Sequence, residues 1–285
     1  MNRQPRFVQN LMDLDWKLWA RQTLAVLSFE LRRGLSSGRV LFLVMLAGAP
    51  VLVFSLYALF PDDEKFIENL GGTSVLFAIT YRGFFLRLLI FLGCVLVFTR
   101  LFRGDTLERV LHYYFLAPVR REVLVVGKYI AGVSITFLMF SLSMVLSFVL
   151  IYMPGGWPRF QEFMLAGPGL GHLSAYLGTN LLACIRYGSV FLLTGLFFRN
   201  PIVPAGAILG WEYINFLLPP LLKKFSVIYY LESLCPVPIP QTMITLLAEP
   251  APFWMAVPGL IGLTILVLFI AGLKIRRMEV RYQDE

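Results

Sequence analysis

Long apolar runs separated by short polar stretches dominate this chain. A helix needs about 20 predominantly apolar residues to cross the hydrocarbon core of a bilayer. The chain has six apolar runs, and one of them is shorter than this. In that run Arg87 and Arg100 leave an uncharged core only at 88–99, about 18 Å long. We expect these two side chains to reach opposite membrane surfaces. The pattern predicts an all-α polytopic membrane protein with six transmembrane helices. The five longer runs lie at residues 40–60, 129–153, 173–198, 201–218 and 253–273.

Residues 15–33 show a different, amphipathic pattern. At helical spacing, Trp16 and Trp19 fall on one side, and Lys17 and Arg21 fall on the other. Tryptophans at the acyl boundary and cations at the headgroups are typical of a helix that lies on the membrane surface. Glu30 falls near the apolar side and breaks this pattern. An amphipathic helix packed on a partner protein is the alternative.

Composition and charge narrow the class of protein. With 58% hydrophobic residues, 15% charged residues and a mean hydropathy of +0.74, a water-soluble globule is excluded. The net charge is +8, and the lysines and arginines are distributed unevenly along the chain. With a cytoplasmic N-terminus, eighteen of these 25 residues fall on the cytoplasmic side of the membrane and five on the external side. This is the positive-inside bias of membrane proteins, and we expect no nucleic-acid partner.

The charge distribution also predicts a domain organisation. We expect a cytoplasmic N-terminus with the interfacial helix at 1–39, a six-span transmembrane domain at 40–273 and a cytoplasmic tail at 274–285. No removable signal peptide is expected. Between spans five and six, prolines separate two apolar pieces at 225–234 and 241–247. Pieces this short do not span a bilayer, so we expect a re-entrant or interfacial segment on the external side.

The longest charged stretch between apolar runs, residues 102–132, lies between spans two and three on the cytoplasmic side. Thr106 is a candidate helix N-cap, and Pro118 would end that helix. The residues between them carry an apolar stripe at spacings of three and four. These residues alone support two interpretations equally: an amphipathic helix that transmits force, or a passive loop anchored to headgroups.

Two sequence elements of this stretch resemble the signature loop of ABC-2-type transporter permeases. They are Gly-Asp-Thr-Leu-Glu at 104–108 and Leu-Ala-Pro-Val-Arg-Arg-Glu-Val-Leu-Val-Val-Gly-Lys-Tyr-Ile-Ala-Gly at 116–132. An aspartate interrupts the family's Gly-Thr, and Thr106 and Pro118 are about one helical turn further apart than is common. Both departures concern the surface that would meet a partner. The order of predicted elements along nearly the whole chain is also similar to that family.

The resemblance implies a cytoplasmic coupling helix at 106–116 that docks on a nucleotide-binding subunit, while Gly127 and Lys128 mark the start of span three. No phosphate-binding Gly-x-x-x-x-Gly-Lys-Ser/Thr motif is present, because Tyr129 follows Gly127-Lys128. The resemblance therefore places ATP and Mg²⁺ on a separate ATPase and leaves this chain without enzymatic activity or cofactor. The residues expected to couple to the ATPase are Gly104, Thr106, Leu107, Glu108, Arg109, Leu111, Pro118, Arg120 and Arg121.

The function implied is that of a permease subunit of a bacterial inner-membrane exporter, paired with a second copy or a homologue. The absence of a large external domain favours a lipid-like or amphipathic substrate taken from the membrane. A secondary transporter driven by an ion gradient and a non-transporting scaffold or assembly subunit are the alternatives. Only two histidines are present, which excludes haem pairs and histidine-rich metal sites within the membrane.

Polar residues within the spans provide further candidate sites. Arg186 and Glu212 lie at equal distances from a predicted turn at Arg199, and we expect either an intramembrane ion pair or separate roles in a central cavity. A second set shares one face of span three, where close helix packing and a transport path are both open interpretations. Its members are Thr136, Phe140, Ser143 and Ser147.

Overall fold

Helices form all the regular structure in the described part of the chain. The structure is a computed structural model that describes residues 16–35, 38–60, 70–107, 121–198, 200–214, 219–224, 226–239 and 251–276. The α-helices are α2 (Trp16–Leu35), α3 (Arg39–Leu59), α5 (Leu70–Thr80), α6 (Phe91–Leu107), α8 (Arg121–Tyr152), α9 (Trp157–Leu165), α10 (Gly169–Phe197), α11 (Ile202–Ile214), α12 (Pro220–Lys223), α13 (Val227–Ser233) and α14 (Phe253–Arg276). A π-helix, η1 (Tyr81–Ile90), joins α5 to α6, and a 3₁₀ turn, η2 (Met153–Gly155), follows α8.

Five helical stretches are long and apolar enough to cross a membrane, which confirms a polytopic all-α membrane protein. The sixth expected span, 201–218, corresponds to α11, which has 13 described residues and is about 20 Å long. That length is below the roughly 30 Å of a bilayer core. The six-span count is therefore not confirmed within the described residues. The five stretches are Val40–Leu59, Leu70–Leu101, Glu122–Gly155, Gly169–Phe197 and Phe253–Ile275.

The second span differs most from its expected form. It runs over 32 residues from Leu70 to Leu101 and includes all of η1. The uncharged core at 88–99 is only the last part of this span, because the helix begins well before it and Arg82 and Arg87 lie inside the helix. Both arginines bind groups of other segments: Arg82 donates to the carbonyl of Val237 at 2.7 Å, and Arg87 pairs with Glu232. Their charges therefore need not leave the bundle.

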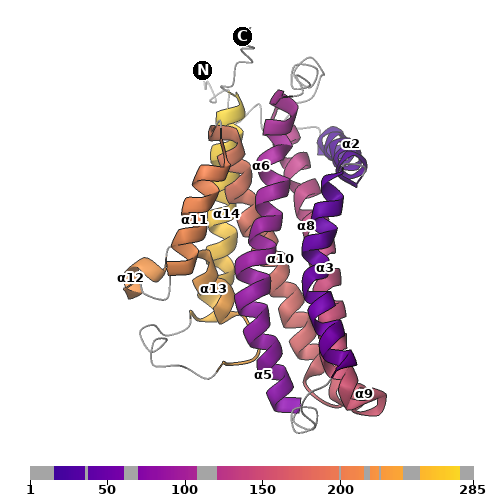
Figure 1. Ribbon diagram of the computed structural model, residues 1–285. Coiled ribbons are helices and arrows are strands. Elements are labelled where there is room, and N and C mark those ends of the chain that lie inside the picture. The colour runs from indigo at the N-terminus through magenta and orange to yellow at the C-terminus, as the bar shows by residue number, and fades with distance from the viewer. Residues whose placement is uncertain are drawn as a thin grey trace, which may run out of the picture.

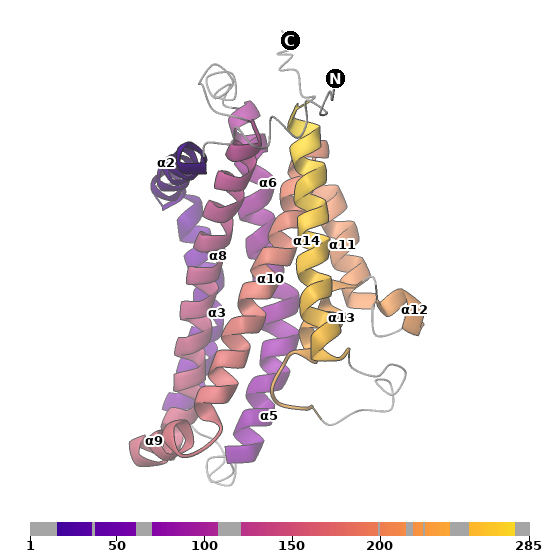
Figure 2. The same ribbon diagram turned by 180° about the vertical axis from the view of Figure 1, so that it is seen from behind.

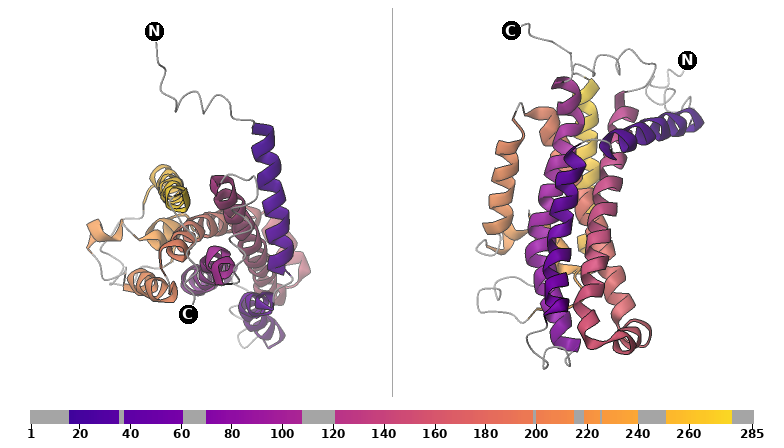
Figure 3. Two further views of the ribbon diagram at one scale, coloured as in Figure 1. Left: turned by 90° about the horizontal axis from the view of Figure 1, so that it is seen from above. Right: turned by 45° about the vertical axis from the view of Figure 1, so that its right-hand side comes forward.

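The long helices pack side by side, and α2 lies across one end of the bundle, against α8 (Figures 1 and 3). Its range, Trp16–Leu35, nearly matches the amphipathic stretch of the sequence. The end of α6 and the start of α8 lie at this same end of the bundle (Figure 1). On the opposite side of the bundle from α2, α13 packs on α10 and α14 (Figure 2).

An aromatic cluster fills the core between α5, η1, α8 and α10. Phe77 packs edge-to-face on Phe148 with ring centroids 5.1 Å apart, and Tyr81 lies 4.5 Å from Tyr176. All four side chains are buried. The Tyr81 hydroxyl donates to the backbone carbonyl of Tyr176 at 3.0 Å, so the cluster also satisfies a polar group in an apolar environment.

Glycines of α10 allow the close approach of α6. A Cβ on Gly195 would lie 2.8 Å from the backbone oxygen of Thr99, and one on Gly188 would lie 2.5 Å from the ring of Phe98. Small residues at such crossings let helix backbones pack directly, which is how helices associate where water provides no driving force.

The substitution Gly195→Ala should therefore lower stability, because the helix backbone of α6 cannot yield to the new methyl group. We expect a loss of about 1–3 kcal/mol, measured by thermal unfolding in detergent. The matched control is Gly178→Ala on the same helix, where a Cβ meets no atom within 4 Å. Equal behaviour of the two variants would contradict the close α6–α10 contact.

Candidate functional site

The residues expected to couple to an ATPase fall only partly within the described structure. Gly104, Thr106 and Leu107 lie in the last turns of α6, which ends at Leu107. Thr106 therefore lies inside the helix of span two and does not begin a separate helix. Arg121 is the first residue of α8. The other five, Glu108, Arg109, Leu111, Pro118 and Arg120, lie outside the described residues, so the coupling helix stays a prediction.

The Gly127–Lys128 pair lies at the joint between α2, α6 and α8. The fully buried Lys128 ammonium donates to Glu30 of α2 and, at 3.1 Å, to the backbone carbonyl of Leu101 of α6. A Cβ on Gly127 would lie 2.8 Å from a methyl carbon of Val26, so this glycine lets α2 approach α8. Glu30, which breaks the amphipathic pattern of α2, is thus the partner of a buried lysine.

Glu212 binds the start of α13. Its side chain is 3% exposed, and it accepts hydrogen bonds from the backbone amides of Val227 at 3.0 Å and Ile228 at 3.1 Å. The hydroxyl of Ser226 donates to the same carboxylate. A helix N-terminus presents unpaired amides and a partial positive charge, both of which favour a carboxylate. Glu212 of α11 therefore caps α13 from outside that helix.

The expected ion pair between Arg186 and Glu212 is not formed. Arg186 contacts the hydroxyl of Ser189 at 3.5 Å, one turn further along α10. Symmetry about a turn at Arg199 would bring the two charges together only if α10 and α11 formed an antiparallel hairpin in contact along their full length. The amides of α13 take the carboxylate instead.

Two arginines of η1 bind the other end of α13, in the proline-interrupted segment between α11 and α14, which we call the broken segment. Arg87 donates to Glu232 of α13 through Nε at 3.1 Å and Nη2 at 2.7 Å, and Arg82 donates to the carbonyl of Val237. The Arg87 and Glu232 side chains are 20% and 28% exposed, so this pair is partly shielded from solvent. Together with Glu212, these contacts attach both ends of α13 to the bundle.

Sequence reasoning missed this network because its members lie far apart in the chain. Arg87 was expected to reach a membrane surface, and Glu232 was not recognised as a candidate. One signal was available: Glu232 is an acidic residue in an apolar piece too short to span, and an arginine precedes the short core of span two. Charges of opposite sign in two incomplete apolar runs favour a pairing between them.

Cys235 lies next to this network, in the segment that follows α13. Burial raises the pKa of its thiol to about 12, while the neighbouring Arg82 opposes that rise. The thiol is thus protonated at neutral pH, and a protonated thiol is a poor nucleophile.

The polar face of span three packs against other helices. Thr136, Phe140, Ser143 and Ser147 of α8 are all buried. The Ser143 hydroxyl donates to the backbone carbonyl of Ala47 on α3, and the Phe140 ring occupies the space that a Cβ on Gly93 of α6 would fill. These contacts favour close helix packing over a path lining.

The described residues contain no cluster of three or more side chains that could ligate a metal. Comparison with protein-family models finds no match to this chain, and comparison with curated proteins finds no relative. The supported identity is that of a multi-helix membrane protein with five apolar helices of spanning length.

The contact between Arg87 and Glu232 can be tested by a double-mutant cycle of Arg87→Gln and Glu232→Gln. Each single change leaves a partly buried charge without its partner, so the double variant should be more stable than the sum of the single losses implies. We expect a coupling free energy of about 1–2 kcal/mol from thermal unfolding, between the values for exposed and buried pairs. Additive losses would show that the pair does not stabilise the fold.

The hydrogen bonds from the start of α13 to Glu212 can be tested by substitution of Glu212. Glu212→Ala leaves two buried amides without an acceptor and should cost about 1–3 kcal/mol of stability, with Glu212→Gln costing less because one oxygen is kept. Glu162→Ala, at an exposed position of α9, is the control.

The charge swap of Arg186→Glu with Glu212→Arg should not restore folded yield above either single change. Recovery in the double swap would instead support a direct pair.

Proposed function

We propose that this chain is the membrane-spanning permease subunit of an ATP-driven exporter of the ABC-2 type. In this proposal the residues between α6 and α8 dock on a separate ATPase, which supplies ATP and Mg²⁺. A second copy of the chain or a homologue completes the transporter in a bacterial inner membrane, with both termini in the cytoplasm. The substrate would be a lipid-like or amphipathic molecule that enters from the membrane.

The observation that carries this proposal is the joint at Lys128. The 108–120 segment connects the end of α6 to the start of α8, and Lys128 binds α8 to both α2 and α6 close to that connection. A displacement of the segment would therefore act on three helices together. Rigid elements with a packed, hydrogen-bonded joint can carry such a displacement into the bundle.

The continuous second span supports the same proposal. The helix that ends at Leu107 contains η1, whose arginines hold α13. π-helical turns occur often at functional positions. The 108–120 segment is thus connected through one helix to the broken segment between α11 and α14.

An ion-gradient-driven transporter is the second candidate, favoured by the buried Glu212 and by Arg186 within the bundle. Intramembrane ionisable groups are typical of coupling-ion sites. The hydrogen bonds from α13 to Glu212 give this residue a structural role already, which makes the first candidate the better supported one.

Affinity purification of the chain from its native membrane tests the proposal. We expect an ATPase with a phosphate-binding loop to co-purify, and replacement of residues 106–116 by a Gly/Ser linker to abolish its recovery. The matched control replaces residues 62–68, which fall on the other side of the membrane in the expected topology, and should retain the ATPase. Substrate transport in proteoliposomes without any ATPase would overturn the proposal.

A further inference from the structure

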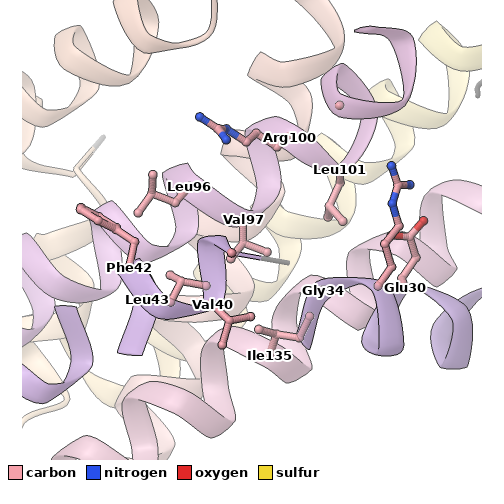
Figure 4. Close-up of a pocket in the computed structure, with 13 residues that line it drawn as sticks. Glu30, Gly34, Val40, Phe42, Leu43, Leu96, Val97, Arg100, Leu101 and Ile135 are labelled. Carbon is pink, nitrogen blue, oxygen red and sulfur yellow. The ribbon is translucent and has the colours of Figure 1, made fainter. Parts of the chain in front are cut away.

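A cavity of about 500 Å³ lies where α2, α3, α6 and α8 meet (Figure 4). Its volume is within the range of about 300–1,000 Å³ that is usual for small-molecule sites. Helices α3 and α6 both pack on α8, and side chains of α3 and α6 line the cavity, with Ile135 of α8 also contributing. The cavity is separate from the network at α13.

The lining of the cavity is amphipathic along the bundle axis. Leu43 of α3 and Leu96 and Val97 of α6 form apolar walls. Arg100 follows them one turn later on α6, towards the end of the bundle that carries α2, where Glu30 also lines the cavity. A molecule that fits must therefore present an apolar portion to the interior of the bundle and a polar portion towards its end.

The charge of the polar end is positive. The carboxylate of Glu30 is already bound by the buried Lys128. Arg100 is exposed and makes no hydrogen bond or ion pair with any other residue that the structure describes. In Figure 4, the Arg100 side chain extends from α6 away from Glu30. Its guanidinium is thus available for an anion, and guanidinium groups bind phosphate through paired hydrogen bonds.

The cavity opens to the outside of the bundle. Phe42 of α3 lines it and is 56% exposed, and Arg100 lines it from α6 and is also exposed. Both residues belong to span-length helices or their ends, so the opening faces the membrane near one surface. A soluble anion would gain nothing from the apolar walls, whereas a lipid reaches them directly from the bilayer.

We propose that this cavity binds one anionic phospholipid, with its phosphate at Arg100 and part of an acyl chain against Leu43, Leu96 and Val97. The lipid fills the space between α3 and α6 next to the α2 joint, and so supports the packing of α2 on the bundle. This site does not depend on the exporter proposal, because it requires only that the helices lie in a membrane.

Native mass spectrometry of the delipidated full chain in detergent tests the site. The probes are phosphatidylglycerol and phosphatidylcholine with identical acyl chains, titrated separately, and inorganic phosphate as competitor. We expect one phosphatidylglycerol to bind more tightly than phosphatidylcholine and to resist millimolar phosphate. Arg100→Gln should weaken the binding by about ten-fold, while Arg100→Lys should weaken it less.

Filling the cavity provides a second, independent variant. Gly104 is buried and lines the cavity, and a Cβ there meets no atom within 4 Å, so the first carbon of a Gly104→Leu side chain has room and the rest should extend into the lipid's space. Arg159→Gln, on the exposed surface of α9 at the other end of the bundle, should leave binding unchanged. Equal binding of the two lipids, displacement by phosphate, or full binding by both Arg100→Gln and Gly104→Leu would each overturn the proposal.

Discussion

The buried contact between Lys128 and Glu30 determines how the α2 end of the molecule is built. A buried ammonium without a partner would cost several kcal/mol, so α8 can place Lys128 in the interior only if another segment brings a carboxylate to it. Helix α2 does so by lying across the bundle, and Gly127 leaves room for the approach. The carbonyl of Leu101 accepts a further hydrogen bond from the ammonium, which includes α6 in the same joint. The position of α2 thus follows from the charge on α8.

The same constraint explains the broken segment. Glu212 and the arginines of η1 are polar groups in apolar helices, where each must find a partner inside the protein. Helix α13 is too short to span a bilayer, yet its N-terminal amides and Glu232 supply those partners. Its folding back against the bundle therefore stabilises charges on both α11 and η1. A helix of full spanning length would present its amide ends at the membrane surfaces, where they could not reach Glu212.

The long helices and the helix at 16–35 could be predicted from the sequence, because apolar length and amphipathic pattern are local properties of the chain. The pairing of charges that lie far apart in the chain could not be predicted from the sequence. The sequence places Arg87 beside an apolar run of 88–99, and the natural interpretation is a helix boundary. The structure continues the helix through this arginine because Glu232, far along the chain, neutralises it. Glu212 was recognised as a charge that needs a partner because it lies in an apolar run. Its partners include backbone amides, which every residue except proline carries, so the sequence does not indicate which of them bind it.

The two polar regions are connected by a single helical element. The second span begins at Leu70, passes through η1 and continues as α6 to Leu107. One end therefore reaches the joint at Lys128, and the middle carries the arginines that hold α13. A shift of this helix along its axis cannot change one region alone, since the hydrogen bonds of Leu101, Arg82 and Arg87 all involve it. The π-helix η1 itself carries the contacts to the segment around α13, and regular α-helix from Phe91 onward connects it to the joint at Lys128. One continuous helical element from Leu70 to Leu107 thus joins the contacts at Lys128 to those around α13.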